Sequence, residues 1–256
     1  MKSRTLVRHT ASLPRPAELY ATMTDVPILF EDDDLLAVEK PAGTLSHPNK
    51  GGKGKCAFRG SYDFEERKFE FEGQTVWLLH RLDQDTSGVM LAAKSKEMAD
   101  VIRERFKCHE VRKTYQALVT GLPRSASGTW RDHIQTNHSD DRVRSKIVTN
   151  RPPNAELNFK VIEKYRKEGL ACLEIELVTG RTHQIRVQGA SRFHHVLGDR
   201  IYGNFEANRK ARRALGLKRF FLHAAAVELK HPGTGKWLRI ESPLPDALEE
   251  ALGRLQ

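Results

Sequence analysis

Short segments in which apolar and polar residues alternate are the feature that most constrains the fold. Residues 171–177 alternate cleanly, and residues 115–119 and 157–161 show the same pattern. A period of two is typical of a strand that buries one of its faces. Together with two apolar segments at 220–229 and 237–240, these runs predict a large, mostly antiparallel sheet.

The first part of the chain predicts a hairpin and two segments outside the sheet. Two apolar runs within residues 28–38 are separated by the acidic run 31–34, which is typical of a turn between strands. Residues 49–74 are rich in Gly, Lys and Glu, and we expect them to form a surface insertion. Residues 1–26 are basic and weakly periodic, and we expect an N-terminal extension that precedes one domain over 27–256.

Helices are predicted at three places. Ser95 is expected to cap a helix over 96–107, where the apolar residues recur at helical spacing. Thr182 is placed to cap a short helix, and a last helix is predicted over 245–255. The sequence therefore predicts an α+β fold, with a large, mostly antiparallel mixed sheet flanked by helices and loops.

The charge balance points to a polyanionic partner. The chain has 43 Lys and Arg residues against 33 Asp and Glu residues, a net charge of +10. Phosphate contacts release counterions, so a surplus of this size favours nucleic acid. One basic cluster lies at 142–151 and a denser one at 209–219. From the denser cluster we expect RNA contacts by Arg209, Lys210, Arg212 and Arg213. Neither cluster has the opposing apolar face of a membrane-surface helix, so we expect no membrane partner.

Other classes of protein are disfavoured. No apolar run approaches the ~20 residues that span a bilayer, and no apolar segment follows the basic start as it would in a signal peptide. The three cysteines have neither disulfide nor zinc-ligand spacing, which favours a reducing compartment, and we expect a cytoplasmic protein.

The stretch HRLDQDTSG, residues 80–88, lies between two apolar runs. An isolated aspartate such as Asp83 is most often a turn or cap residue. Asp83 and Asp85 could also form a metal site with His80, but no second cluster supplies the three or four convergent ligands that a metal needs. We therefore expect no metal, and the stretch is either a polar turn or a reaction centre.

Two further motifs carry candidate residues. KTYQALV, residues 113–119, places Tyr115 on the apolar face of a predicted strand, where a core tyrosine is the alternative. TGRTHQIRV, residues 179–187, places Arg186 one helical turn beyond Thr182. The alternative for Arg186 is an ordinary surface arginine on an amphipathic helix.

Taken together, these motifs resemble one family. HRLDQDTSG, KTYQALV, GRTHQIRV, HHVLGDRIYG and FLHA occur in the order and approximate separation seen in RluA-like pseudouridine synthases. The segment EDDDLLAVEKPAGTLSHP resembles the start of that family's catalytic domain. The resemblance covers residues 27–243, and the pairing of HRLD-x-x-TSG with a later GRTHQIR is highly specific.

The resemblance implies a role for each candidate residue. Asp83 is expected to be the catalytic carboxylate and Arg186 its ion-pair partner. Tyr115 is expected to pack on the target base, and Arg81 to insert into the RNA where that base is removed. A carboxylate in a water-poor pocket stays charged only beside a cation, and arginine, always charged and planar, suits that task.

The chemistry that the resemblance implies has two rivals. Isomerising uridine in RNA involves no redox change, so we expect no cofactor, and we expect a monomer that acts on ribosomal or transfer RNA. An RNA N-glycosidase would use the same carboxylate but needs a second acid or base, for which Asp85 is the candidate. An RNA-binding or ribosome-assembly protein could also use this fold with little catalysis.

Overall fold

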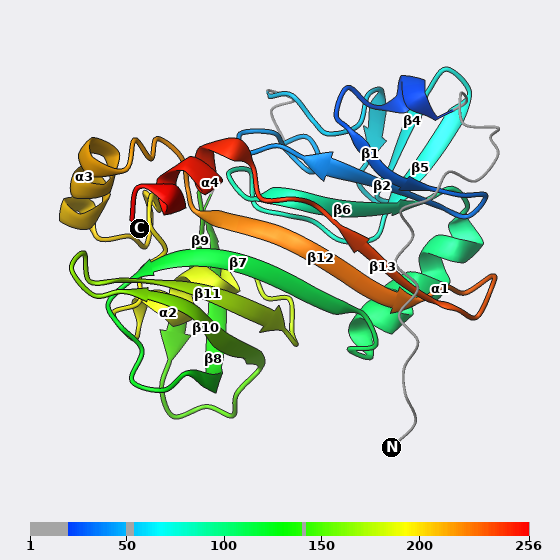
Figure 1. Cartoon of the computed structure of the whole chain (residues 1–256). Helices are drawn as coiled ribbons and strands as arrows, with labels where there is room; N and C mark the ends of the chain where they lie inside the picture. Colours follow the sequence, from blue (N-terminus) through cyan, green and yellow to red (C-terminus); the bar gives the residue numbers. More distant parts are fainter. Residues whose placement is uncertain (1–19, 50–53, 140–141, 256) are drawn as a thin grey trace. The chain divides into compact units, whose positions relative to one another are not determined.

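The computed structural model describes residues 20–49, 54–139 and 142–255. These residues form two compact units. The first comprises the described residues up to Arg112 together with Ala226–Ser242, and the second comprises the described residues from Lys113 to Ala225 and from Pro243 onward. Figure 1 shows that strands dominate over helices. The strand pairs within each unit are antiparallel, so the predicted α+β class is confirmed. No helix in the described part of the chain has the length and apolar character needed to cross a bilayer.

The sheet of the first unit runs in the order β1-β2-β6-β5-β4-β3. Strand β12 begins in the second unit and ends in the first, where it pairs with β13. The elements are η1 (Ala21–Met23), β1 (Ile28–Glu31), β2 (Leu35–Lys40), β3 (Ser61–Asp63), β4 (Lys68–Phe71), β5 (Gln74–Leu78), β6 (Ser87–Ala93), α1 (Lys96–Lys107), β12 (Leu222–Lys230) and β13 (Trp237–Glu241).

Local signals place the predicted hairpin and helix of this unit. In the turn between β1 and β2, Asp32 Oδ1 accepts hydrogen bonds from the backbone N–H groups of Asp34 and Leu35, at 2.9 and 2.7 Å. At the start of α1, Ser95 Oγ accepts a bond of 3.1 Å from the Met98 N–H, as expected of an N-cap. Both predictions are confirmed.

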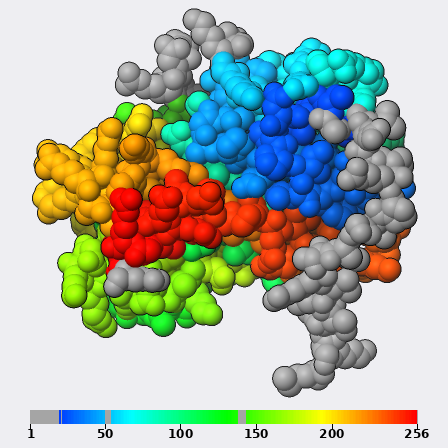
Figure 2. Space-filling model, turned by 45° about the horizontal axis from the view of Figure 1, so that its top comes forward, coloured from blue at the N-terminus to red at the C-terminus, as the bar shows by residue number. Residues whose placement is uncertain are grey.

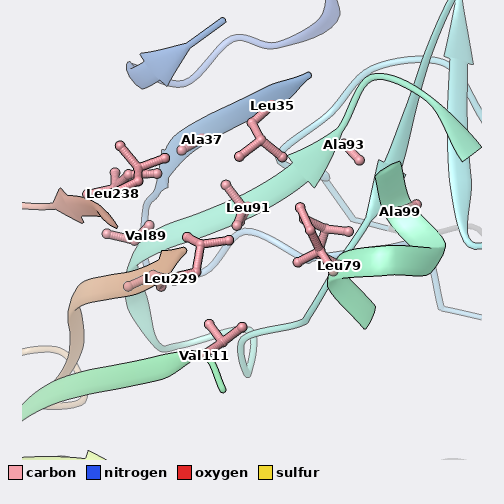
Figure 3. Close-up of a cluster of buried hydrophobic side chains, with 13 residues drawn as sticks. Leu35, Ala37, Leu79, Val89, Leu91, Ala93, Ala99, Val111, Leu229 and Leu238 are labelled. Atoms are coloured by element: carbon pink, nitrogen blue, oxygen red, sulfur yellow. The ribbon is translucent and has the colours of Figure 1, made fainter. Parts of the chain in front are cut away.

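The core of the first unit lies against β2 and β6. Alternate residues of these strands, including Leu35 and Leu91, join Ala99 of α1 in one buried cluster (Figure 3). Every residue of β6 is buried, because both faces of this strand are covered. A strand buried on both faces reads as a continuous apolar run, which is how residues 89–93 read in the sequence.

The prediction of a surface insertion at 49–74 is wrong for much of its length. Strands β3 and β4 lie within it, and Phe58 and Phe69 are buried. Their rings pack together with centroids 5.7 Å apart. Exposed charged residues such as Lys55, Glu65 and Glu70 outnumber the few aromatic residues that are buried, so composition alone gives the wrong answer.

The expected N-terminal extension, 1–26, lies mostly outside the described residues. Its last part belongs to the first unit, since Met23 is buried and the Thr24 hydroxyl donates a bond of 2.6 Å to the Ala57 carbonyl. The domain boundary at residue 27 stays a prediction.

The sheet of the second unit runs in the order β7-β11-β10-β8-β9. Helices α3 and α4 pack against an apolar cluster that includes Leu118, Leu215 and Leu248. The elements are β7 (Arg112–Thr120), β8 (Ser127–Ser139), β9 (Arg142–Val148), β10 (Ala155–Tyr165), β11 (Leu170–Leu177), α2 (Gln184–Ala190), α3 (Phe205–Ala214) and α4 (Asp246–Gly253).

The sequence did not predict the hairpin of β8 and β9 or the helix α3. In β8 only Trp130 and Ile134 are buried apolar residues, so the strand lacks a clear period of two. Helix α3 buries little beyond Ala211, and its basic composition hides its helical period.

Candidate active site

Asp83 lies in the connection between β5 and β6 of the first unit. The Thr86 N–H donates a bond of 3.0 Å to the Asp83 carbonyl, which closes a tight turn. Thr86 and Ser87 are buried, whereas Asp83 is partly exposed. The turn is therefore anchored at the start of β6 and leaves the Asp83 carboxylate within reach of a ligand.

The residue before Asp83 is held by a buried serine. Ser46 Oγ accepts a bond of 2.9 Å from the Leu82 N–H and donates one of 2.8 Å to the Leu82 carbonyl. Both backbone groups of Leu82 are thus fixed by one side chain. A side chain carried on a backbone fixed in this way loses little freedom when it binds a substrate.

The residue after Asp83 is held by a buried lysine. Lys40 is 0% exposed, and its Nζ donates to the carbonyls of Pro41, Thr44 and Gln84, at 3.1, 2.7 and 2.9 Å. The Gly43 N–H donates a further bond of 2.9 Å to the Gln84 carbonyl. A buried ammonium group is tolerated only when hydrogen bonds replace its water, so Lys40 forces the 41–44 turn onto this loop.

The metal alternative finds no support at this loop. His80 Nε2 accepts a bond of 3.0 Å from the Leu91 N–H, which occupies that nitrogen's lone pair. Its ring also packs on Phe106, with centroids 5.3 Å apart. In the part of the chain that the structure describes, no group of three or more His, Cys, Asp or Glu residues could hold a metal ion.

Arg81 and Tyr115 lie in different surroundings. Arg81 is exposed, and its Nη1 lies 3.4 Å from His47 Nε2. Tyr115 of β7 is buried, opposite Ile175 of β11. Lys113 is also buried, two residues before Tyr115 and on the same face of β7, and burial lowers its pKa to about 8.

Arg186 lies on α2, where it is only 8% exposed, so the surface-arginine alternative is wrong. Its Nε and Nη2 donate bonds of 2.8 and 2.9 Å to the two carboxylate oxygens of Asp199, which is 1% exposed. Its guanidinium carbon also lies 5.1 Å from the centroids of both the Tyr202 and Phe220 rings. Two hydrogen bonds and two rings therefore fix the plane of the guanidinium.

Asp199 remains a carboxylate despite its burial. Burial by itself raises its pKa, but the hydrogen bonds and charge of Arg186 outweigh it, and the N–H groups of Ile201 and Tyr202 add two further bonds. The net pKa of Asp199 is lowered. The sequence alone indicates no role for Asp199, because only the fold brings it to its partner Arg186.

Helix α2 begins differently from the prediction. Its N-cap is His183, in the left-handed conformation with φ +56° and without a side-chain cap, so Thr182 is not the cap. Gln184 orders the approach instead, since its Oε1 accepts bonds from Thr179 Oγ1 and the Arg181 N–H, at 2.8 and 3.0 Å. His183 Nδ1 lies 3.0 Å from the hydroxyl of Tyr202, the residue whose ring packs on Arg186.

The candidate residues are shared between the two units. Asp83 and Arg81 belong to the first unit, whereas Tyr115 and Arg186 belong to the second. Asp199 binds Nε and Nη2 of Arg186. The ion pair of Arg186 with Asp83 stays a prediction.

The predicted basic cluster forms one side of α3. Asn204 caps the helix by accepting a bond of 3.0 Å from the Ala207 N–H, and Ala211 faces the core. Figure 2 shows this helix at the outer surface of its unit, next to α4. Its exposed basic residues are Arg209, Lys210, Arg212 and Arg213.

Several known proteins are similar to this chain in sequence. The model of the RNA pseudouridylate synthase family matches residues 34–191. The chain is 37% identical to ribosomal large subunit pseudouridine synthase C of Escherichia coli O157:H7, over 92% of this chain and 72% of that protein. The Salmonella typhimurium protein of the same name is 38% identical, over 91% of this chain and 70% of that protein.

Solved structures extend the likeness to the fold. Human RNA pseudouridylate synthase domain containing 4 aligns with a TM-score of 0.67 at 24% identity, over 90% of this chain and 92% of that chain. Human RNA pseudouridylate synthase domain containing 1 aligns with a TM-score of 0.66 at 23% identity, over 89% and 88% of the two chains. At these identities the likeness concerns the fold alone.

The buried pair of Arg186 and Asp199 predicts a large loss of stability on mutation. Asp199→Asn is expected to lower the free energy of unfolding by about 3–5 kcal/mol, because a buried guanidinium then lacks its counter-charge. Urea unfolding at pH 7 measures the change. The control is Glu156→Gln, since Glu156 also binds an arginine, Arg131, through two hydrogen bonds, but that pair is exposed.

The control is expected to lose less than about 1 kcal/mol. Equal losses in the two variants would show that burial adds nothing to the pair. The Asp199 contribution is present above its unfolded pKa of about 3.9 and is lost as the pH falls through its lowered folded pKa. The difference between Asp199→Asn and the native protein is therefore expected to shrink in strong acid.

Proposed function

Because the chain belongs to the RNA pseudouridylate synthase family, we propose that it modifies large-subunit ribosomal RNA with Asp83 as its catalytic carboxylate. The chain is an RNA pseudouridine synthase, an isomerase that acts on uridines in RNA. The choice of large-subunit ribosomal RNA rests on the names of the relatives from Escherichia coli and Salmonella typhimurium. Transfer RNA is the alternative substrate, and a map of pseudouridine in cellular RNA distinguishes the two.

The reaction sets what the site must provide. The N1–C1′ glycosidic bond of uridine breaks, the base turns, and a C5–C1′ bond forms, while C5 loses a proton and N1 gains one. Atoms and electrons balance without a redox partner, so we expect no cofactor. A base inside a helix must first be flipped out, at a cost of a few kcal/mol.

The fixed position of Asp83 is the observation that carries the proposal. Its two chain neighbours, Leu82 and Gln84, are held by Ser46 and Lys40, which supports a carboxylate carried on backbone that is ordered before the RNA arrives. A group positioned in advance contributes to the rate because it needs little reorganisation at the moment of reaction. Asp85 is more exposed than Asp83, and an exposed carboxylate is poorly suited to be the second acid or base of an RNA N-glycosidase.

The other residues receive roles that fit their surroundings. Arg81 is exposed beside Asp83 and can fill the gap left by the flipped base. Tyr115 offers an aromatic face to that base, and stacking of this kind contributes about 1–3 kcal/mol. We propose that Arg186, oriented by Asp199, keeps Asp83 charged and aimed. We further propose that the enzyme works as a monomer in the cytoplasm.

Replacing Asp83 tests the proposal. Asp83→Asn is expected to lower the single-turnover rate by at least about a thousandfold, since the amide is nearly isosteric but is neither charged nor nucleophilic. The rate is measured as tritium released to water from 5-tritiated uridine in a large-subunit ribosomal RNA transcript. Asp85→Asn is the matched control and is expected to keep activity within about threefold of the native enzyme.

The identity of the product separates the rival chemistries. Digestion of the RNA to nucleosides is expected to yield pseudouridine and no free uracil. Free uracil with abasic RNA would establish the N-glycosidase. Turnover by Asp83→Asn at a rate near the native one would refute the role of Asp83.

The basic face of α3 is proposed to contact phosphates. Changing Arg209, Lys210, Arg212 and Arg213 together to Gln is expected to weaken RNA binding and to flatten its salt dependence. Each lost phosphate contact removes about 0.7–0.9 from the magnitude of the slope of log K against log salt, so a change of up to about 3.6 is expected for four contacts. Filter binding between 50 and 300 mM salt measures the slope.

A control with the same change of charge keeps this test specific. Four exposed lysines outside α3, Lys107, Lys167, Lys230 and Lys236, are changed to Gln together. We expect a clearly smaller change of slope. If the two quadruple variants had the same slope, α3 would be ordinary charged surface and the RNA would lie elsewhere.

A further inference from the structure

A hollow of about 360 Å³ opens beside the Asp83 loop, within the first unit. This volume lies within the range of small-molecule sites. Its walls combine aromatic rings with cationic side chains and include no carboxylate. They are formed by His47, Tyr62, Phe64, Arg67, Leu78, His80 and Arg81. The site described above uses only Arg81 of this set.

The aromatic wall of the hollow is tied to the core. Tyr62 stacks on His47 with ring centroids 5.5 Å apart and planes 12° apart, and meets the edge of Phe64 at 5.0 Å. On its other side Tyr62 packs on the buried Phe69 at 4.7 Å. As a whole residue, Phe64 is nevertheless 55% exposed. The wall therefore presents an aromatic surface to solvent on a rigid support, as stacking sites for bases do.

The charge in the hollow is positive. Arg67 acts on the Tyr62 hydroxyl through a hydrogen bond and its charge. Nearby carboxylates are engaged elsewhere. Asp63 accepts the N–H groups of Glu65 and Glu66, and the Glu66 carboxylate lies 3.7 Å from the Lys96 ammonium. Cations beside an aromatic wall are suited to a nucleotide, which offers a flat base and a phosphate.

His47 links the hollow to the Asp83 loop. Its Nδ1 donates to the Pro48 carbonyl at 2.9 Å, which leaves Nε2 to accept from Arg81 at 3.4 Å. The pKa of His47 is lowered by its burial, against a bond to Pro48 that raises it, and by the charges of Arg81 and Arg67. A neutral His47 can therefore both stack on Tyr62 and orient Arg81.

The hollow lies close to Asp83 along the chain. Only Leu82 separates Arg81 from Asp83, so the Cα atoms of these two residues lie at most about 7 Å apart. Resting on the proposed function, we propose that the hollow binds a second unpaired nucleotide of the substrate RNA, a neighbour of the target uridine. Its base stacks on Phe64 and Tyr62, and its phosphate contacts Arg67 and Arg81. The enzyme then reads an unpaired stretch of RNA as well as the target itself.

A cycle between protein and RNA tests this proposal. Binding is measured in the Asp83→Asn background, where no turnover occurs, with an RNA fragment that the native enzyme modifies. Phe64→Ala is expected to weaken binding about tenfold. The same RNA is then prepared with an abasic nucleotide at each of the two positions on either side of the target.

On one of these abasic RNAs, the protein with Phe64 intact is expected to lose about as much affinity as Phe64→Ala loses on the intact RNA. On that same abasic RNA, Phe64→Ala is expected to cause no further loss of affinity. The control is Trp237→Ala, which removes another exposed aromatic residue of the same unit outside the hollow. It is expected to bind every RNA like the native protein.

Two results would overturn the proposal. Phe64→Ala could bind the intact RNA like the native protein, or its loss could be the same on every abasic RNA. Formation of pseudouridine by the native enzyme is measured separately. Either result would therefore refute the binding of a nucleotide in the hollow and leave the proposed function intact. A native enzyme that forms no pseudouridine would refute the proposed function itself.

Discussion

A charged group buried in a protein must be hydrogen-bonded or paired, and this constraint acts on candidate residues in each of the two units. In the first unit Lys40 draws three carbonyls to its ammonium group, one of them from the loop that carries Asp83. In the second unit Asp199 grips two nitrogens of Arg186. Removing Lys40 would leave three carbonyls without this donor, and removing Asp199 would leave the buried guanidinium of Arg186 without its counter-charge.

Such placement suits a reaction in which the protein supplies no redox chemistry. The RNA must be opened, a base turned, and the sugar rejoined to the base through carbon. In the proposed mechanism the protein contributes a carboxylate, aromatic faces that replace lost base stacking, and cations for phosphate. Burial of Tyr115 and exposure of Arg81 and of the α3 basic residues fit the division between base binding and phosphate binding.

Sequence reasoning succeeded where the signal was local. The helix capped by Ser95 and the strand over 171–177 depend on residues close in the chain, and both were predicted. The roles proposed for Asp83, Tyr115 and Arg186 rest on motifs rather than on spacing alone. Their supports were missed, because Lys40 reads as the polar end of a strand and becomes a buried clamp only through the carbonyl of Gln84, 44 residues away.

Tertiary packing also explains the errors. The N-cap of α2 is His183 rather than the expected Thr182, and the amide oxygen of Gln184 orders the preceding turn by accepting two bonds, an arrangement that composition does not reveal. The charged residues of the segment 49–74 outnumber Phe58 and Phe69, the two buried rings that attach it to the core, so its composition indicates a surface insertion. The role of Asp199 depends on a partner 13 residues away that is brought to it by a loop and a helix.

The most direct measurement of the central claim is a map of pseudouridine, at single-nucleotide resolution, in RNA from cells with and without this protein. The account predicts that one or a few uridines of large-subunit ribosomal RNA lose the modification when the protein is absent. Their modification should return with the native gene but not with a copy that encodes Asn at position 83. Identical maps in the two cell types, or full restoration by the Asn copy, would contradict it.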